Sequence, residues 1–549
     1  MKPNIRAIMV QNMITKLFEL TLQQEMQKEW KRLEILSKKQ RGGIGQRSVY
    51  DNLLDVFIHI DHAKKQQEAY RREKKKVDER EKTFIVCFDF KKAYDNLNRQ
   101  LLIKKMLNYG INPKLVSVAK KLLTGTKMEI NGVKYETEKG TPQGSTLSPD
   151  NWNLYCADLA KDLETIKQLE PKKKVGDQHE NVDKILPLFF VDDLAIVVRG
   201  EKALEETYQR VKKWADENYV PINVAKSAVM IAKVDRRTPD PTNWNFHGIP
   251  LKQEYKYLGF NLTPQLGVDV SIQVKNDMDR KLRANEWLLT SPKLDGPARF
   301  HIWQTLFRSR VNYSINIASI FNKKIAKWYK GFTYRACLKL LNVKGKPEKE
   351  RTLRLCLGQS FEEYLESEQQ NSIAHICNSA LEYKEPERIQ IIEQALKEKG
   401  IQMPAKVDRQ GYKRIKINLP IKTLLKKELT GSQIKWRLGI AFNTGLRELK
   451  QSKCTCQEEK TISQKHLKEC PLYKTIWEKK AKEYKSTIQQ LLDFIEGFKL
   501  EKEKHKENNE KLTRYVKIVS NLNQQVIEVL QKNRQQQALR LRTIPAMSY

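Results

Sequence analysis

Two short apolar segments that contain acidic residues are the strongest constraint on the fold of this 549-residue chain. Thr83–Phe90 (TFIVCFDF) and Ile185–Val198 (ILPLFFVDDLAIVV) are rich in β-branched and aromatic residues, which is typical of buried strands. Asp89 lies in the first segment, and Asp192 and Asp193 interrupt the second where a hairpin turn would fall. The two segments therefore predict neighbouring strands that bring carboxylates to one place.

Clustered carboxylates favour a site for divalent cations. Burying a carboxylate costs several kcal/mol unless positive charge accompanies it. Oxygen-rich sites suit Mg²⁺ or Mn²⁺, and two such ions about 3.5–4 Å apart can assist a displacement at phosphorus. From these residues alone one alternative stays open: Asp192 and Asp193 form an ordinary type I turn, and Asp89 is an acid at a strand edge.

The charge of the chain points to a polyanionic partner. It has 102 Lys and Arg against 66 Asp and Glu, a net charge of +36, and phosphate backbones are the commonest partner of such proteins. A membrane is disfavoured, because no apolar run approaches the roughly 18 residues needed to span one. No secretory signal is evident, and the eight cysteines suit a reducing compartment. We expect an intracellular protein, in the nucleus or in a cytoplasmic ribonucleoprotein.

The remaining patterns predict mostly helices. Asn98–Tyr109 and Ala203–Asn218 each place apolar residues on one helical face, and helical patterning dominates from about residue 268. His62–Lys82 and Glu170–Lys184 are charge-dense and read as solvated loops or helix surface. We expect an α+β fold followed by a mostly α-helical C-terminal region. Five cysteines lie among apolar residues and are expected in the core: Cys87, Cys156, Cys337, Cys356 and Cys377.

A series of short motifs resembles the reverse transcriptases of non-LTR (LINE-type) retrotransposons, with group II intron enzymes as more distant relatives. The counterparts of motifs A to E are Phe88–Asp95 (FDFKKAYD), Gly140–Pro149 (GTPQGSTLSP), Phe190–Asp193 (FVDD), Asn223–Ser227 (NVAKS) and Tyr255–Gly259 (YKYLG), and those of the fingers motifs are Ile5–Ile8 (IRAI) and Gln40–Gly43 (QRGG). Each string is weak alone, but their order over roughly residues 1–350 is specific. The resemblance implies a right-hand polymerase with α/β fingers and palm, an antiparallel sheet and a helical thumb.

The resemblance also implies a chemistry, RNA-templated DNA synthesis with two Mg²⁺ or Mn²⁺ ions. Asp89 and Asp192 would be the main metal ligands, with Asp193 in support and the backbone carbonyl of Phe90 completing one coordination shell. Tyr94 would pack under the incoming sugar and clash with a 2′-hydroxyl, which favours deoxynucleotides. The alternative for Tyr94 is an ordinary core aromatic.

Five further residues are expected, by resemblance, to contact the nucleotide. Gln143 and Gly144 begin a loop whose backbone can approach a template base or nucleotide. Lys226 would lie near the departing pyrophosphate as a charge stabiliser or proton donor. Arg6 and Arg41 would hold triphosphate oxygens. For the three cations the alternative is a solvated surface side chain, and for the loop it is a simple Pro/Gly turn before a helix.

Three departures from the family pattern bear on activity. Val191 stands where most relatives carry Ala, Ala7 replaces a Pro, and Met1 lies almost at the start of the first fingers motif. The expected N-terminal extension is thus missing, which keeps open a catalytically decayed or domesticated copy that only binds RNA or DNA. An RNA-dependent RNA polymerase is disfavoured by Tyr94 and Val191. Telomerase is disfavoured because no extended RNA-binding domain precedes the palm.

The domain order expected from these motifs is linear. Residues 1–265 would form fingers and palm, 266–350 a helical thumb containing helices at Val274–Leu289 and Arg299–Tyr313, 351–450 a helical connector, and 476–549 a basic helical or partly disordered tail. The partners implied are an RNA template, a DNA primer or target, and dNTPs. No endonuclease series is evident, so DNA nicking is expected from another polypeptide, if at all.

A cysteine–histidine cluster within residues 451–475 predicts a zinc knuckle. Cys454, Cys456, His466 and Cys470 form a CCHC set that resembles the C-terminal motif of LINE-type proteins. On a helix, His466 and Cys470 would share one face, as a tetrahedral Zn²⁺ site requires. The spacing is tighter than usual, so the alternative is three unpaired thiols and a surface histidine.

Overall fold

A computed structural model describes most of the first 404 residues and parts of the C-terminal region. The described residues are 9–73, 82–124, 127–130, 133–168, 185–233, 241, 243–263, 270–291, 294, 296–341, 347–357, 359–404, 466, 469–497, 510, 513–515, 517–519, 525 and 528. They fall into two compact units. Unit 1 lies within residues 1–274, 316–325 and 369–409, and unit 2 within 275–315, 326–368 and 410–549.

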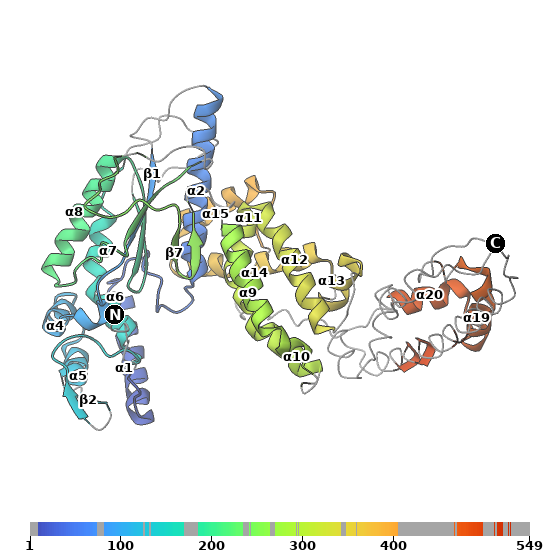
Figure 1. The fold of residues 1–549 in the computed structure, drawn as a ribbon. Coiled ribbons are helices and arrows are strands. Elements are labelled where there is room, and N and C mark those ends of the chain that lie inside the picture. Colours follow the sequence, from blue (N-terminus) through green and yellow to red (C-terminus); the bar gives the residue numbers. More distant parts are fainter. Residues whose placement is uncertain are drawn as a thin grey trace, which may run out of the picture. The chain divides into compact units, whose positions relative to one another are not determined.

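A four-stranded antiparallel sheet forms the centre of unit 1. Its strands are β1 (Thr83–Phe88), β4 (Leu186–Phe190), β5 (Asp193–Arg199) and β6 (Ala228–Ile231), in the order β4-β5-β1-β6. Figure 1 shows α7 (Ala157–Leu163) and α8 (Glu201–Glu217) on one side of this sheet and α2 (Val49–Arg72) on the other. Both faces are covered, which explains why all six residues of β1 are buried. The two acid-containing segments are therefore paired strands, as predicted.

The other elements of unit 1 surround this core. They are α1 (Met13–Arg32), α3 (Ala93–Asn96), α4 (Arg99–Asn108), α5 (Pro113–Thr124), β2 (Lys127–Ile130), β3 (Val133–Glu136), α6 (Ser148–Tyr155), β7 (Tyr255–Tyr257), β8 (Phe260–Leu262) and α15 (Pro386–Glu398). The predicted α8 helix is confirmed, and Leu204, Tyr208, Val211 and Trp214 are buried. In α4, Leu102 and Met106 are buried, whereas Leu107 on the expected apolar face is 47% exposed.

The helical C-terminal region is also as predicted. Its elements are α9 (Val270–Thr290), α10 (Gly296–Ile302), the π-helical segment η2 (Trp303–Arg308), α11 (Ser309–Phe321), α12 (Lys323–Leu340), α13 (Lys349–Leu357), α14 (Phe361–Glu382), α19 (Pro471–Glu483) and α20 (Ile488–Gly497). The second expected thumb helix is thus divided among α10, η2 and α11. The antiparallel sheet followed by helices is the α+β architecture expected from the sequence.

The two compact units do not follow the expected domain boundaries, because each unit contains three separate stretches of the chain. The described residues 369–404, expected in a separate connector, belong to unit 1 together with the N-terminal residues. Within the described part of the chain, every helix is too short or too polar to cross a bilayer. The five cysteines assigned to the core are buried. The charge-dense segment that begins at His62 is part of α2 as far as Arg72, while Glu170–Lys184 lies outside the described residues.

The cysteine–histidine cluster is only partly described. Cys454 and Cys456 lie outside the described residues. The amide of Cys470 donates a 2.8 Å hydrogen bond to the carbonyl of His466, and both residues are buried. This i to i+4 bond places them on successive turns of one helix. The zinc knuckle itself stays a prediction.

Candidate active site

A cavity of about 750 Å³ lies where β1 ends. Its walls come from the β1–α3 segment, the loop before α6, the β4–β5 turn and the segment before β6. The lining residues are Asp89, Phe90, Lys91, Lys92, Ala93, Tyr94, Asp95, Asn96, Gln143, Gly144, Ser145, Ser148, Pro149, Asp192, Pro221, Asn223 and Lys226. Four of the five motif segments expected to form a polymerase site therefore meet at one cavity.

Asp89 is held at this cavity by both its backbone and its side chain. Its amide donates to Ser227 Oγ at 3.1 Å, and its carbonyl accepts the Asn223 amide at 2.7 Å. The Asn223 side-chain amide also donates to the Asp89 carboxylate at 2.7 Å. A hydrogen-bonded turn thus fixes the direction of the carboxylate, which belongs to a half-buried residue. This turn contains Lys226, so its cation is carried to the same cavity.

Asp192 lies in a strained two-residue turn between β4 and β5. Phe190 pairs with Asp193 across the hairpin, which leaves Val191 and Asp192 as the central residues. Val191 has φ +58°, which lies in the left-handed region, so this turn is not of type I. Glycine normally occupies a position with such φ, and a β-branched residue there is strained.

The backbone of the turn is held by two side chains. Gln40 Oε1 accepts the Val191 amide at 3.1 Å, and Gln40 Nε2 donates to the Val191 carbonyl at 3.4 Å. The indole of Trp152 donates to the same carbonyl at 3.0 Å. Both polar backbone groups of the strained residue are therefore satisfied. The segment containing Gln40 also pairs with the edge of β4, where the Arg41 amide donates to the Phe189 carbonyl at 3.0 Å.

Gly42 is packed against this turn and gives a sharp prediction. A Cβ at Gly42 would lie 2.3 Å from the Val191 nitrogen and 2.6 Å from the Phe190 carbonyl carbon. Since both contacts are backbone, we expect Gly42→Ala to displace the hairpin and to lower the free energy of unfolding by about 1–3 kcal/mol. A Cβ at Gly45, three residues on, meets nothing within 4 Å. Urea denaturation should separate the two alanine variants, and equal midpoints for both would contradict this packing.

Tyr94 forms an aromatic wall of the cavity. Its ring stacks on Trp152, with centroids 6.2 Å apart and planes inclined by 19°. Burial raises the pKa of the Tyr94 hydroxyl, and the negative charge of Asp192 raises it further. The hydroxyl is therefore protonated at neutral pH, so the ring offers steric bulk and hydrogen bonding and not an ionised base. Tyr94 and Asp192 both line the cavity.

The loop before α6 is positioned by a residue that sequence reasoning missed. The Glu19 carboxylate, on α1 and only 4% exposed, accepts bonds from Ser145 Oγ at 2.9 Å and from the Thr146 amide at 2.9 Å. Gln143 Nε2 in the same loop donates to Asp95 at 3.4 Å. The only sequence signal for Glu19 is an acid on the buried side of an amphipathic helix.

Removal of the Glu19 carboxylate should weaken this loop. We expect Glu19→Ala to lower stability by about 1–3 kcal/mol, because it leaves a buried hydroxyl and a backbone amide without their acceptor. Glu25→Ala on the same helix is the matched control, since the Glu25 side chain is 49% exposed. Thermal melting of both variants measures the difference. Indistinguishable melting temperatures would show that Glu19 does not support the loop.

The expected site residues divide into three groups. Those that line the cavity are Asp89, Phe90, Tyr94, Gln143, Gly144, Asp192 and Lys226. Asp193 does not line it but lies near Cys87, where burial raises the pKa of the thiol and the Asp193 charge raises it further. Arg41 is fully buried and ion-paired with Asp55 at 2.7 Å, away from the cavity. Arg6 lies outside the described residues.

The cavity residues fit a divalent cation whose coordination is completed by its substrate. Among the described residues, no group of three or more His, Cys, Asp or Glu side chains is arranged to hold a metal ion. Asp89 and Asp192 nevertheless face one cavity, and Asp192 is exposed to solvent. Mg²⁺ is commonly bound by one or two carboxylates together with substrate phosphates. The carboxylates of Asp89 and Asp192 at one cavity meet that requirement.

Comparison with known proteins agrees with this geometry. Residues 2–262 match the family described as "Reverse transcriptase (RNA-dependent DNA polymerase)". The RNA-directed DNA polymerase from the mobile element jockey of Drosophila funebris is 25% identical over 250 residues, 43% of this chain and 26% of that protein. The probable RNA-directed DNA polymerase from transposon X-element of Drosophila melanogaster is 23% identical over 256 residues, 44% and 26% of the two chains. The matched part spans about a quarter of the length of either relative.

One solved structure is also similar to this chain, with a lower sequence identity than the two relatives above. It is telomerase from Candida tropicalis in complex with a fragment of telomeric RNA, with a TM-score of 0.33, 12% identity and coverage of 70% of this chain and 57% of that one.

The antiparallel sheet and the cavity with its two carboxylates lie within the residues matched to reverse transcriptases. This part of the chain is therefore similar to reverse transcriptases, and the two named relatives come from a mobile element and a transposon of Drosophila.

Proposed function

We propose that this protein is an RNA-directed DNA polymerase that extends a primer 3′-hydroxyl with deoxynucleotides on an RNA template. The observation that carries the proposal is the meeting of Asp89, Asp192 and Tyr94 at one cavity inside the region matched to reverse transcriptases. In the reaction, the primer 3′-oxygen bonds to the α-phosphorus of the dNTP. The bond from that phosphorus to its bridging oxygen breaks, pyrophosphate leaves, and the hydroxyl proton is released.

The carboxylates of Asp89 and Asp192 and the carbonyl of Phe90 would hold the metal ions, with Asp193 in support. Two bound Mg²⁺ or Mn²⁺ ions supply activation of the hydroxyl and neutralisation of the leaving group. Asn223 orients the Asp89 carboxylate through its 2.7 Å hydrogen bond. Lys226, exposed at the cavity, is suited to the charge of the departing pyrophosphate.

We assign nucleotide selection to two other parts of the cavity wall, the Tyr94 ring and the loop that contains Gln143 and Gly144. The Tyr94 ring, backed by Trp152, would lie under the incoming sugar and exclude a 2′-hydroxyl. Gln143 and Gly144 would approach the templating base or the nucleotide. For Arg41 we propose a structural task, because its guanidinium is buried and paired with Asp55.

The remaining parts are assigned by position along the chain. We propose that the helices after β8 include a thumb that binds duplex, and that the excess of positive charge serves RNA template and DNA primer binding. We further propose that the protein works inside the cell, in the nucleus or in a cytoplasmic ribonucleoprotein. A separate polypeptide would supply any DNA nicking.

Incorporation of dTTP on poly(rA)/oligo(dT) tests the proposal. We expect Mg²⁺-dependent extension that stops when the metal is chelated. Primer–template binding without extension under either Mg²⁺ or Mn²⁺ would contradict it and would favour the alternative of a decayed copy that only binds nucleic acid. Preferential use of ribonucleotides would instead point to an RNA polymerase.

A further inference from the structure

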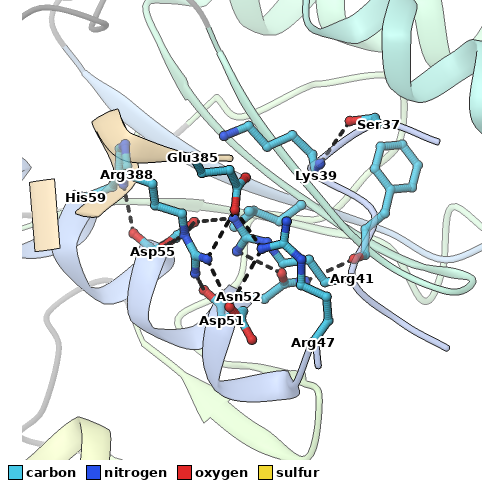
Figure 2. Close-up of polar contacts among 12 residues, drawn as sticks. Ser37, Lys39, Arg41, Arg47, Asp51, Asn52, Asp55, His59, Glu385 and Arg388 are labelled. Carbon is cyan, nitrogen blue, oxygen red and sulfur yellow. Dashed lines mark hydrogen bonds and ion pairs between the residues drawn. The ribbon is translucent and has the colours of Figure 1, made fainter. Parts of the chain in front are cut away.

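Six charged side chains form a buried cluster in unit 1, outside the cavity (Figure 2). The members are the guanidiniums of Arg41, Arg47 and Arg388 and the carboxylates of Asp51, Asp55 and Glu385. Each of these side chains is at most 7% exposed. Each carboxylate is paired with at least one guanidinium, which makes such burial tolerable. The matched reverse transcriptase region supplies four members, and the start of α15 supplies the other two.

Arg388 is the centre of this cluster. Its Nε donates to both carboxylate oxygens of Asp55, at 3.1 and 3.2 Å, and its Nη1 donates to the Asp51 carboxylate at 2.9 Å. Its Nη2 donates to the backbone carbonyl of Asp51 at 3.0 Å. One guanidinium thereby fixes two successive turns of α2. Figure 2 shows Arg388 beside the carboxylates of Asp51 and Asp55.

The cluster continues to the strand that precedes the Asp192 turn. Arg41 Nη2 donates to Asp55 at 2.7 Å and Nη1 donates to Asn52 at 3.1 Å. Asn52 Nδ2 and the Arg41 amide both donate to the carbonyl of Phe189 in β4, at 3.2 and 3.0 Å. Gln40, the residue before Arg41, binds the Val191 amide, so the same two segments meet again at the turn itself.

The charges within the cluster keep Asp55 and Arg388 ionised. Burial alone would raise the pKa of Asp55, but the guanidiniums of Arg388 and Arg41 more than offset it and hold that pKa well below its usual range. Burial would lower the pKa of Arg388, but Asp55, Asp51 and Glu385 more than offset it and raise it. Loss of one member therefore leaves an uncompensated buried charge.

We propose that Arg388 is a positioning residue for the Asp192 turn, acting through the α2 carboxylates and Arg41. The inference rests on the proposed polymerase function for its catalytic consequence, but its structural consequence is independent of it. The α15 segment is then part of the support of the active site, although it lies well beyond the residues matched to the family.

Amide hydrogen exchange in the full chain tests the structural part directly. In Arg388→Met, we expect amides of the β4–β5 hairpin to exchange about tenfold faster or more, while amides pairing β1 with β6 keep their protection. Gln390→Ala is the control, since Gln390 is exposed on the same helix. Unchanged hairpin exchange, or an equal increase throughout the sheet, would overturn the proposal.

Primer extension tests the catalytic part. We expect Arg388→Met to lower kcat at least about tenfold and to raise the Mg²⁺ concentration for half-maximal rate, with primer–template affinity unchanged. A loss of affinity at unchanged kcat would overturn positioning of Asp192. If the wild-type protein shows a protected hairpin but no synthesis, the proposed function fails while the exchange result still decides the role of Arg388.

A second variant keeps the test decisive if Arg388→Met does not fold. Arg388→Lys keeps the charge but cannot bridge Asp51 and Asp55 with a planar fork. We expect it to fold, and to show the same two effects in smaller degree. Normal hairpin exchange and normal kcat in a folded Arg388→Lys protein, combined with an unfolded Arg388→Met, would reduce Arg388 to a source of stability and overturn its positioning role.

Discussion

Replacement of Asp192 by asparagine is expected to abolish dTTP incorporation while the fold is retained. Asp192 lies in an exposed turn, so the change costs little packing. It removes one of two carboxylates facing the cavity, and with it a ligand for the proposed metal ions. We expect the rate to fall at least about 10³-fold, equal to about 4 kcal/mol of transition-state stabilisation. Single-turnover extension of a radiolabelled primer measures this loss.

The same loss is expected for Asp89→Asn, and a matched control is available in unit 1. Asp216 is exposed on α8, where it pairs with Lys212 one helical turn away. Asp216→Asn should extend the primer at the wild-type rate. Activity of Asp192→Asn within about tenfold of wild type would remove Asp192 from the proposed chemistry. Equal loss in Asp216→Asn would show a general effect of charge.

Replacement of Tyr94 by alanine is expected to weaken discrimination against ribonucleotides by about 10²-fold or more, because the ring no longer occupies the space beside the sugar. The ratio of kcat/KM for dTTP to that for UTP on poly(rA) measures the change. The rate with dTTP should fall less than the ratio does. The hydroxyl is protonated at neutral pH, so the effect belongs to the ring itself.

Two controls separate the ring from general damage. Tyr94→Phe retains the aromatic wall and should retain selectivity. Tyr219→Ala removes a tyrosine that is 69% exposed and should change neither rate nor ratio. Unaltered selectivity in Tyr94→Ala would leave Tyr94 as a core aromatic that packs on Trp152 and has no part in choosing the sugar.

The centre of the site could be predicted from the sequence because strand patterns are local. The apolar runs around Asp89 and Asp192 specified two strands, and antiparallel pairing brings their ends together. The positive φ of Val191 could not be predicted in the same way, because the groups that hold its backbone, Gln40 and Trp152, lie outside the hairpin.

The ionic roles of Arg41 and Arg388 could not be predicted from the residues around them in the sequence. Arg41 looked like any of the many cations in a basic chain, and only burial beside Asp55 distinguishes it. Arg388 is 333 residues from Asp55, and nothing in its own helix indicates an ionic partner in α2. Long-range pairs of this kind depend on packing, which a single sequence pattern does not report.

The separation of these partners along the chain has a consequence during synthesis. Asp55 leaves the ribosome long before Arg388 is made, and at about 5–20 residues per second the 333 residues between them take roughly 15–70 s. Throughout that interval Asp51 and Asp55 lack Arg388, and within the cluster only Arg41 and Arg47, which are made earlier, can pair with them. The buried charge cluster of unit 1 is therefore completed only when α15 emerges.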